Sequence, residues 1–213
     1  MEGLKQKISK DTYLQKGSAE HGGYAGGFTS IWITENNTVA LPEEDGLLGQ
    51  ILNPYNFNRA YLKVCRNKGS HGVDGLSVES LRDYLKQHGS DLITSIINGQ
   101  YRPNPVRRVE IPKDAKSKRP LGIPTVVDRV IQQAIHQVLS PVYERQFSNN
   151  SFGFRPKRST HKALFQCKRF ISEGYRYGID MDMAKFFDTV NHSKLIEILS
   201  RTVKDGRVIS LIH

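Results

Sequence analysis

Residues 106–138, VRRVEIPKDAKSKRPLGIPTVVDRVIQQAIHQV, decide the fold class, because their apolar residues first follow the two-residue period of a strand and then the helical period. Apolar and charged side chains alternate up to Lys113, which is typical of a half-buried strand. A polar loop, 114–118, leads into a second extended run, so the segment predicts a β-hairpin with a basic tip. From Thr125 to Val138, apolar residues recur at helical spacing. The chain is therefore expected to mix helices and strands.

Helix signals surround this hairpin on both sides. Thr125 is predicted as an N-cap with Asp128 at the capping-box position, and the helix is expected to end or kink near Pro141. Other apolar stripes predict further helices at 47–52, at 57–68, from 77 or 78 onward, from 159 or 160 onward, and at 193–203.

The segment after Ser159 carries two further expectations. Its apolar stripe is expected to face a core, and it consists of Ala163, Leu164, Cys167, Phe170 and Ile171. Tyr177–Met183 is predicted as the last strand.

Composition places the chain among globular proteins of a reducing compartment. Its 213 residues are 38% hydrophobic, enough for a core, and include only two cysteines, Cys65 and Cys167, with no zinc-like pattern around them. No apolar run approaches the roughly 18 residues that a membrane span needs. We expect a cytoplasmic protein without a membrane partner, in which residues 1–45 form a flexible N-terminal arm.

The positive charge is concentrated in one segment. Residues 101–170 contain 15 Lys and Arg but 4 Asp and Glu, a net charge of +11, against +10 for the whole chain. Such a concentrated field favours a polyanion, most often nucleic acid. A solvated basic face that serves solubility is the alternative interpretation.

Acidic residues follow the last predicted strand. In Ile179–Asp188, Asp180 and Asp182 share one strand face, because residues two apart point the same way. Clustered carboxylates at the end of an apolar strand suit a cation, although an ordinary exposed strand end fits the spacing too. Asp188 also fits the start of a helix.

Two other patterns suit anions. Lys113 and Arg119 flank the hairpin loop and are expected to face each other, and two such cations repel unless an anion, a triphosphate or a phosphodiester, lies between them. Phe152–Arg158 interleaves aromatic and basic residues, as nucleic-acid surfaces do. The alternatives are solvent-exposed cations at a hairpin tip and core phenylalanines in a folded-back loop.

Seven short blocks, taken in order, resemble group II intron reverse transcriptases. They are Gly72–Gly75, Tyr101–Pro103, Ile111–Lys113, Arg119–Thr125, Asp128–Ala134, Ser151–Pro156 and Asp182–Asp188. The resemblance covers roughly 47–213. It implies an α+β fold, a right-hand polymerase with fingers and partial palm, preceded by a helical N-terminal extension. The implied boundaries are 46–100 for the extension and start of the fingers, 101–172 for the fingers and 173–213 for the start of the palm.

The resemblance also implies roles for individual residues. Asp182 matches the first catalytic aspartate, a ligand of Mg²⁺, and the backbone carbonyl of Met183 matches a second contact to the metal. Lys113 and Arg119 match residues that bind the incoming dNTP, and Phe187 matches the aromatic residue that excludes a ribose 2′-hydroxyl. For nucleic-acid contacts we predict Arg107, Arg108, Lys116, Lys118, Arg155, Lys157 and Arg158.

The sequence departs from the family in one respect that bears on activity. The family completes its site with a Tyr-Ala-Asp-Asp turn, and no Tyr-x-Asp-Asp occurs here. We therefore expect this chain to bind group II intron RNA without polymerising on its own, whereas the parent RNA-directed DNA polymerase also handles a DNA target or primer. The alternatives are a non-catalytic RNA-binding splicing cofactor and a basic interaction domain unrelated to nucleic acid. Self-association stays open, as does metal binding by Asp180 or Asp188.

Overall fold

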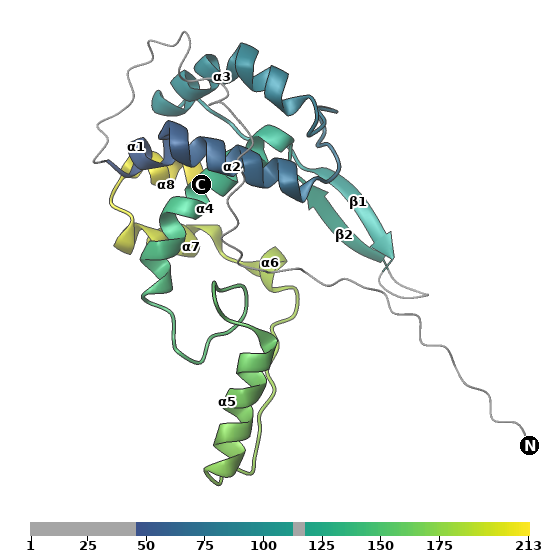
Figure 1. The fold of residues 1–213 in the computed structure, drawn as a ribbon, viewed down its shortest axis with the longest axis vertical. Helices are drawn as coiled ribbons and strands as arrows, with labels where there is room; N and C mark the ends of the chain where they lie inside the picture. The colour runs from purple at the N-terminus through teal and green to yellow at the C-terminus, as the bar shows by residue number, and fades with distance from the viewer. Residues whose placement is uncertain (1–45, 113–117) are drawn as a thin grey trace, which may run out of the picture.

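The computed structural model describes residues 46–112 and 118–213, so the N-terminal arm, Lys113 and Lys116 lie outside the described residues. The helices are α1 (Leu47–Leu52), α2 (Pro54–Asn67), α3 (Leu81–Ile97), α4 (Val126–Glu144), α5 (Thr160–Ser172), α6 (Phe186–Thr189), α7 (His192–Thr202) and α8 (Gly206–Ile212). The strands are β1 (Arg107–Pro112) and β2 (Lys118–Ile123). Figure 1 shows α1, α2, α4 and α8 gathered in one body, from which the hairpin and α5 project.

The core lies mainly between α2 and α4. Phe57, Ala60 and Val64 of α2 and Val127, Val130 and Ala134 of α4 are buried, each set at the three- and four-residue spacing of one helix face. Tyr61 of α2 and Val126 and Ile131 of α4 are buried as well. The other buried apolar side chains come from α1, from the segment 78–96 that contains α3, and from the C-terminal segment: Leu48, Ile51, Leu52, Val78, Leu81, Leu85, Ile93, Ile96, Val203 and Val208. The first and last described helices therefore close around the same core.

Side-chain caps set several helix starts. Asn53, Thr125, Ser159, Asn191 and Asp205 each accept a backbone N–H from the first turn of the helix that follows. Such a cap satisfies one of the four N–H groups that a helix leaves unpaired at its start. The predicted break between α1 and α2 and the predicted starts of α2, α4, α5 and α7 are confirmed to within a few residues.

α4 ends at Glu144, three residues beyond Pro141, near which the sequence predicted an end or a kink. Two other predictions for the helices need correction. The capping box is incomplete. In a complete one the Asp128 carboxylate would accept a hydrogen bond from the Thr125 backbone N–H, but here its Oδ2 accepts one from the Thr125 hydroxyl, with the two oxygens 2.6 Å apart. The third predicted helix begins at Leu81, later than expected.

The β-hairpin is confirmed, and its register corrects one predicted pair. β1 and β2 are antiparallel, with Ile111 opposite Arg119 and Pro112 opposite Lys118. The predicted cross-strand pair of Lys113 with Arg119 is therefore wrong, because β2 starts one residue earlier than the sequence suggested. Cross-strand neighbours follow from the register, and a small change of loop length replaces every pair.

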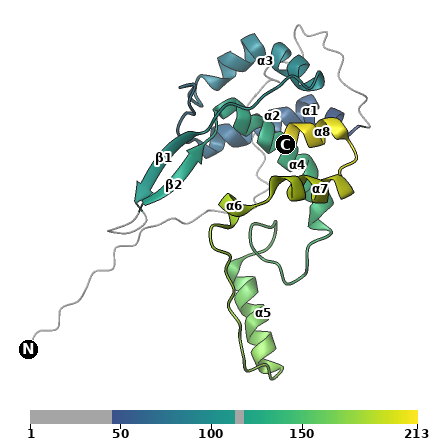
Figure 2. The same cartoon turned by 180° about the vertical axis from the view of Figure 1, so that it is seen from behind.

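The segment from α5 to α6 differs most from expectation. No residue of α5 is buried, so the predicted inward stripe is wrong as a core face: Leu164 and Ile171 are 62% and 69% exposed. The predicted strand Tyr177–Met183 is extended coil, because no strand among the described residues lies beside it to supply hydrogen bonds. Figure 2, the view from behind, shows the chain running away from the body along α5 and returning along the coil that leads to α6. Within the described ranges, no helix has the length and hydropathy to cross a bilayer.

Candidate nucleic-acid interface

The β-hairpin presents cations on both of its faces. The register places Arg107 and Arg119 on one face and Arg108 and Lys118 on the other. Lys118 forms an ion pair with Glu110 at 3.1 Å, and both side chains are largely exposed. Exposed pairs of this kind contribute little to stability, so Lys118 can exchange Glu110 for another anion at small cost.

The loop after α2 is held against the hairpin and α4 by two arginines. Arg129 of α4 donates to the backbone carbonyl of Ser70 at 2.8 Å and to that of Lys68 at 3.4 Å. Arg107 of β1 donates to the carbonyl of His71 at 3.0 Å. Burial lowers the pKa of Arg129. No sequence pattern predicted this role of Arg129, because its partners are backbone atoms about 60 residues away.

The base of the hairpin is joined to α4 by a buried carboxylate. Asp128 accepts hydrogen bonds from the Tyr101 hydroxyl, from the Asn104 backbone N–H at 3.3 Å and from the Thr125 hydroxyl. Burial, and then the hydrogen bond to Asp128, raise the pKa of Tyr101. Three donors satisfy an otherwise costly buried charge. The sequence indicated Asp128 only as a capping residue and missed its contact with Tyr101.

Arg155, predicted to contact nucleic acid, is engaged by the protein instead. Its side chain is 6% exposed and pairs with Glu144 at the end of α4, with Nη2 and Oε1 2.7 Å apart. Its Nη1 donates to the carbonyls of Ser148 and Ser151 at 2.6 and 3.0 Å. The hydrogen bond from Arg155 lowers the pKa of Glu144. Arg155 thus fixes the turn that presents the neighbouring residues, and its predicted contact with nucleic acid stays a prediction.

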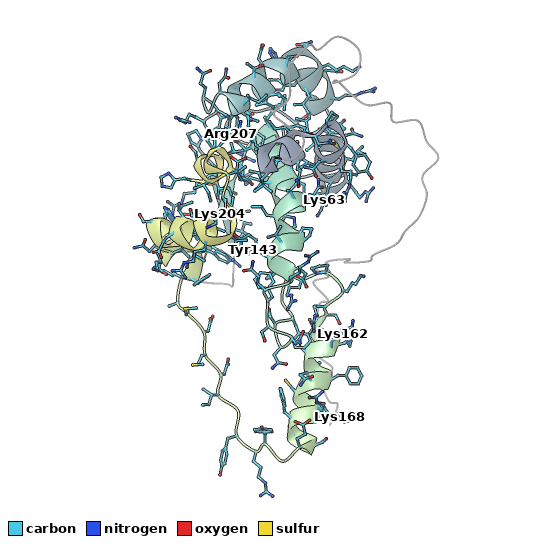
Figure 3. All side chains as sticks on the ribbon, turned by 90° about the vertical axis from the view of Figure 1, so that its left-hand side faces the viewer. Lys63, Tyr143, Lys162, Lys168, Lys204 and Arg207 are labelled. Carbon is cyan, nitrogen blue, oxygen red and sulfur yellow. The ribbon has the colours of Figure 1, made fainter. Side chains whose placement is uncertain are left out.

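A hollow at the base of α5 combines cations with aromatic rings. This α5 hollow, about 550 Å³, is lined by Asn149, Phe152, Arg158, Lys162, Phe165 and Arg169, among others. The guanidinium of Arg158 lies 5.3 Å from the centre of the Phe152 ring and donates to the Asn149 carbonyl at 2.9 Å. Lys162 and Lys168 extend from α5 in Figure 3. Of the predicted residues, Arg158 lines this hollow, and the structure adds Lys162 and Arg169. Lys157 is not a lining residue, but its backbone carbonyl accepts a hydrogen bond from the Lys162 ammonium at 2.7 Å.

The predicted metal and nucleotide residues of the last segment all lie exposed. Asp180, Asp182 and Met183 are on the coil before α6, and Phe187 is 86% exposed in α6. Among the residues that the structure describes, no three His, Cys, Asp or Glu side chains form a group that could hold a metal ion. Mg²⁺ requires nearly octahedral oxygen coordination. The described residues of this segment therefore do not by themselves form a magnesium site.

Comparisons with known proteins support the resemblance to reverse transcriptases. Residues 111–212 match the family model described as reverse transcriptase (RNA-dependent DNA polymerase). The chain is 37% identical over 152 residues to protein YkfC of Escherichia coli, an alignment that covers 68% of this chain and 40% of that protein. It is 36% identical over 164 residues to the group II intron-encoded protein LtrA of Lactococcus lactis, covering 76% of this chain and 27% of LtrA.

A plant protein shares a shorter region with the chain. Nuclear intron maturase 2, mitochondrial, from Arabidopsis thaliana is 36% identical over 85 residues, which cover 40% of this chain and 11% of that protein. The chain thus spans less than half the length of each of these relatives.

Proposed function

The chain belongs to the family of group II intron reverse transcriptases/maturases, and from that premise we propose that its described part binds intron RNA. The whole protein, on this proposal, copies RNA into DNA and assists splicing of its intron. The names of the relatives support this assignment, since they include a group II intron-encoded protein and an intron maturase.

The observation that carries the proposal is the α5 hollow. It brings Arg158, Lys162 and Arg169 together with Phe152 and Phe165, and no acid is among its lining residues. Arg169 forms an exposed ion pair with Glu173 at 2.9 Å, which contributes little and can be exchanged for another anion, whereas Arg158 and Lys162 form no ion pair among the described residues. Phosphates bind such cations, and bases stack on such rings, with little dependence on sequence. The concentrated charge of residues 101–170 supports the same conclusion.

The finer assignments follow the family resemblance. We assign residues 101–172 to the fingers and 173–213 to the start of the palm of a right-hand polymerase. In the parent enzyme, Lys113, Arg119 and Phe187 would contact the incoming dNTP, and Asp182 with the Met183 carbonyl would contact Mg²⁺, the ion that supplies charge stabilisation in phosphoryl transfer. A DNA target or primer is the further partner proposed for the whole protein.

The test is binding of the full chain to a structured group II intron RNA across a salt series. Lys162→Glu is expected to weaken binding and to reduce the slope of log K against log salt by about one or more, because it removes a phosphate contact. Lys86→Glu, on the exposed side of α3, makes the same charge change away from the hollow and serves as the control. Equal effects of both substitutions would contradict the assignment of the hollow.

A further inference from the structure

A second cavity, about 790 Å³ and separate from the α5 hollow, lies between α2, the C-terminal half of α4 and the turn after α4. We call it the α2–α4 groove. The residues that matter here are Arg59, Lys63, Glu144, Phe147, Phe154 and Arg155, which all line it. In Figure 3, Lys63 lies beside α4 and above Tyr143, another lining residue, whereas Lys162 is farther down on α5.

One wall of the groove is cationic. Arg59 and Lys63 are one helical turn apart on α2 and both are exposed, so their charged groups share one face. Among the described residues that line the groove, Glu144 is the single acid, and Arg155 already neutralises it through a bidentate hydrogen-bonded pair. The groove therefore keeps a positive potential, and burial together with the nearby Lys63 lowers the pKa of His136 on the same wall.

The opposite wall is aromatic. Phe147 is 49% exposed, and the Arg155 guanidinium covers its ring at 5.2 Å from the centroid. Phe154 is fully exposed, so no part of its ring is used in the core. A ring that is displayed in this way can stack on a partner without first giving up contacts within the protein.

The backbone at Phe154 is strained in a manner that suits a binding residue. Its φ of 54° lies in the left-handed region, which costs a non-glycine residue roughly 1–2 kcal/mol. Such a conformation persists only where the surroundings enforce it, and ligand-binding residues are common among the cases. Here the enforcing contacts come from Arg155, which binds the carbonyls of Ser148 and Ser151 and the carboxylate of Glu144.

We propose that the α2–α4 groove binds one unpaired nucleotide of an RNA, with its base stacked on Phe154 and Phe147 and its phosphate at Arg59 and Lys63. The volume is within the range of sites that enclose small molecules of this size. A base within a duplex has its faces covered, so the groove selects nucleotides in bulges, loops or single strands. The inference rests on the proposed binding of RNA but assigns it a site that residues 101–170 alone do not form.

The experiment uses the full chain and two RNA hairpins that carry the fluorescent base 2-aminopurine. In one hairpin the analogue is a single-nucleotide bulge, and in the other it is paired. Wild-type protein is expected to change the fluorescence of the bulged RNA much more than that of the paired RNA, and to bind the bulged RNA more tightly. Phe154→Ala should abolish the difference in fluorescence and weaken binding of the bulged RNA by about tenfold, whereas Phe154→Tyr should preserve both.

Matched substitutions separate stacking from charge. Tyr177→Ala removes another aromatic side chain, 97% exposed and outside the groove, and should leave both signals unchanged. Lys63→Glu should weaken both hairpins and flatten the salt dependence more than the control Lys86→Glu. Circular dichroism of each variant checks that the helices persist.

The outcomes distinguish this inference from the proposed function. If Phe154→Ala and Lys63→Glu behave like their controls while Lys162→Glu still weakens binding, the groove holds something else, such as a polypeptide segment, and only the inference fails. If wild-type protein binds neither hairpin nor the intron RNA, both are refuted.

Discussion

The backbone N–H of Leu48 donates to the Asp205 carboxylate at 3.2 Å and so joins the first turn of α1 to the start of α8, 157 residues away. The same carboxylate caps α8 by accepting the Arg207 N–H at 3.0 Å. Burial alone would raise the pKa of Asp205, but hydrogen bonds from the backbone of Leu48, Arg207 and Val208 lower it overall. One side chain therefore serves two helix starts.

Asp205→Ala is expected to destabilise the fold by about 1–2 kcal/mol, the usual cost of losing an N-cap, measured by urea denaturation. Because the folded pKa is depressed, the stabilisation by Asp205 is complete above the ordinary carboxyl pKa and disappears as the pH falls through the folded value. The variant should consequently lose less stability than wild type on acidification. Asp91→Ala, at an exposed position within α3, is the control. If Asp205→Ala lowers the free energy of unfolding no more than Asp91→Ala does, neither the Leu48 hydrogen bond nor the cap of α8 contributes to stability.

Tyr101→Phe is expected to cost about 1–3 kcal/mol, because it leaves the buried Asp128 carboxylate with one donor fewer. Thermal unfolding measures the change, and Tyr177→Phe at a 97% exposed position provides the comparison. Loss of the hydroxyl should also make the base of the hairpin exchange its amide hydrogens faster. An unchanged melting temperature would indicate that Asp128 is sufficiently solvated without Tyr101.

Gly72→Ala is expected to displace the loop after α2. A Cβ at this position would lie 2.6 Å from the Thr125 Cα and 2.8 Å from its backbone nitrogen, closer than real contacts permit. Since backbone atoms cannot move aside as a flexible side chain does, the loop and the N-terminus of α4 must separate, with a cost of about 1–3 kcal/mol. Gly178→Ala meets no atom within 4 Å and should leave the unfolding free energy nearly unchanged. Similar results for both would show that the close approach at Gly72 is easily relieved.

Arg155→Lys is expected to loosen the turn 147–158 while leaving the core helices intact. A lysine cannot reproduce the forked hydrogen bonds to Glu144 together with those to Ser148 and Ser151. Amide hydrogen exchange should rise in this turn and stay unchanged in α2. Because the folded pKa of Glu144 is lowered, the stabilisation of the turn in wild type should weaken as the pH falls below the ordinary carboxyl range. Protection that is independent of both pH and substitution would contradict the role of the ion pair.

Local signals in the sequence predicted the parts of the fold that local chemistry determines. Asn53-Pro54 separates α1 from α2 because Asn accepts the first free N–H and Pro suits the first helical turn. Thr125 marks the start of α4 for the same reason. The apolar stripe of α5 was equally clear, but a stripe indicates which face is apolar and not what covers it, so the buried positions expected there were wrong.

The candidate site was less accessible to prediction from sequence. Lys157 and Arg158 were predicted from a local run of basic and aromatic residues. Arg59 and Lys63 belong to α2, and they line the same groove as Phe154 only because α2 packs on α4. The pairing of Arg119 depended on the hairpin register, which composition does not specify. Asp182, Met183, Arg119, Phe187 and Lys113 remain predictions for the nucleotide and metal contacts.

The isolation of α5 has a consequence for how the protein unfolds. The helix has 13 residues and buries none of them, so its stability comes from local hydrogen bonds and from the Ser159 cap rather than from the core. Isolated helices of this length are marginal in water. We expect α5 to melt and re-form as an independent unit many times for each opening of the α2–α4 pair, so that the molecule has two melting processes instead of one.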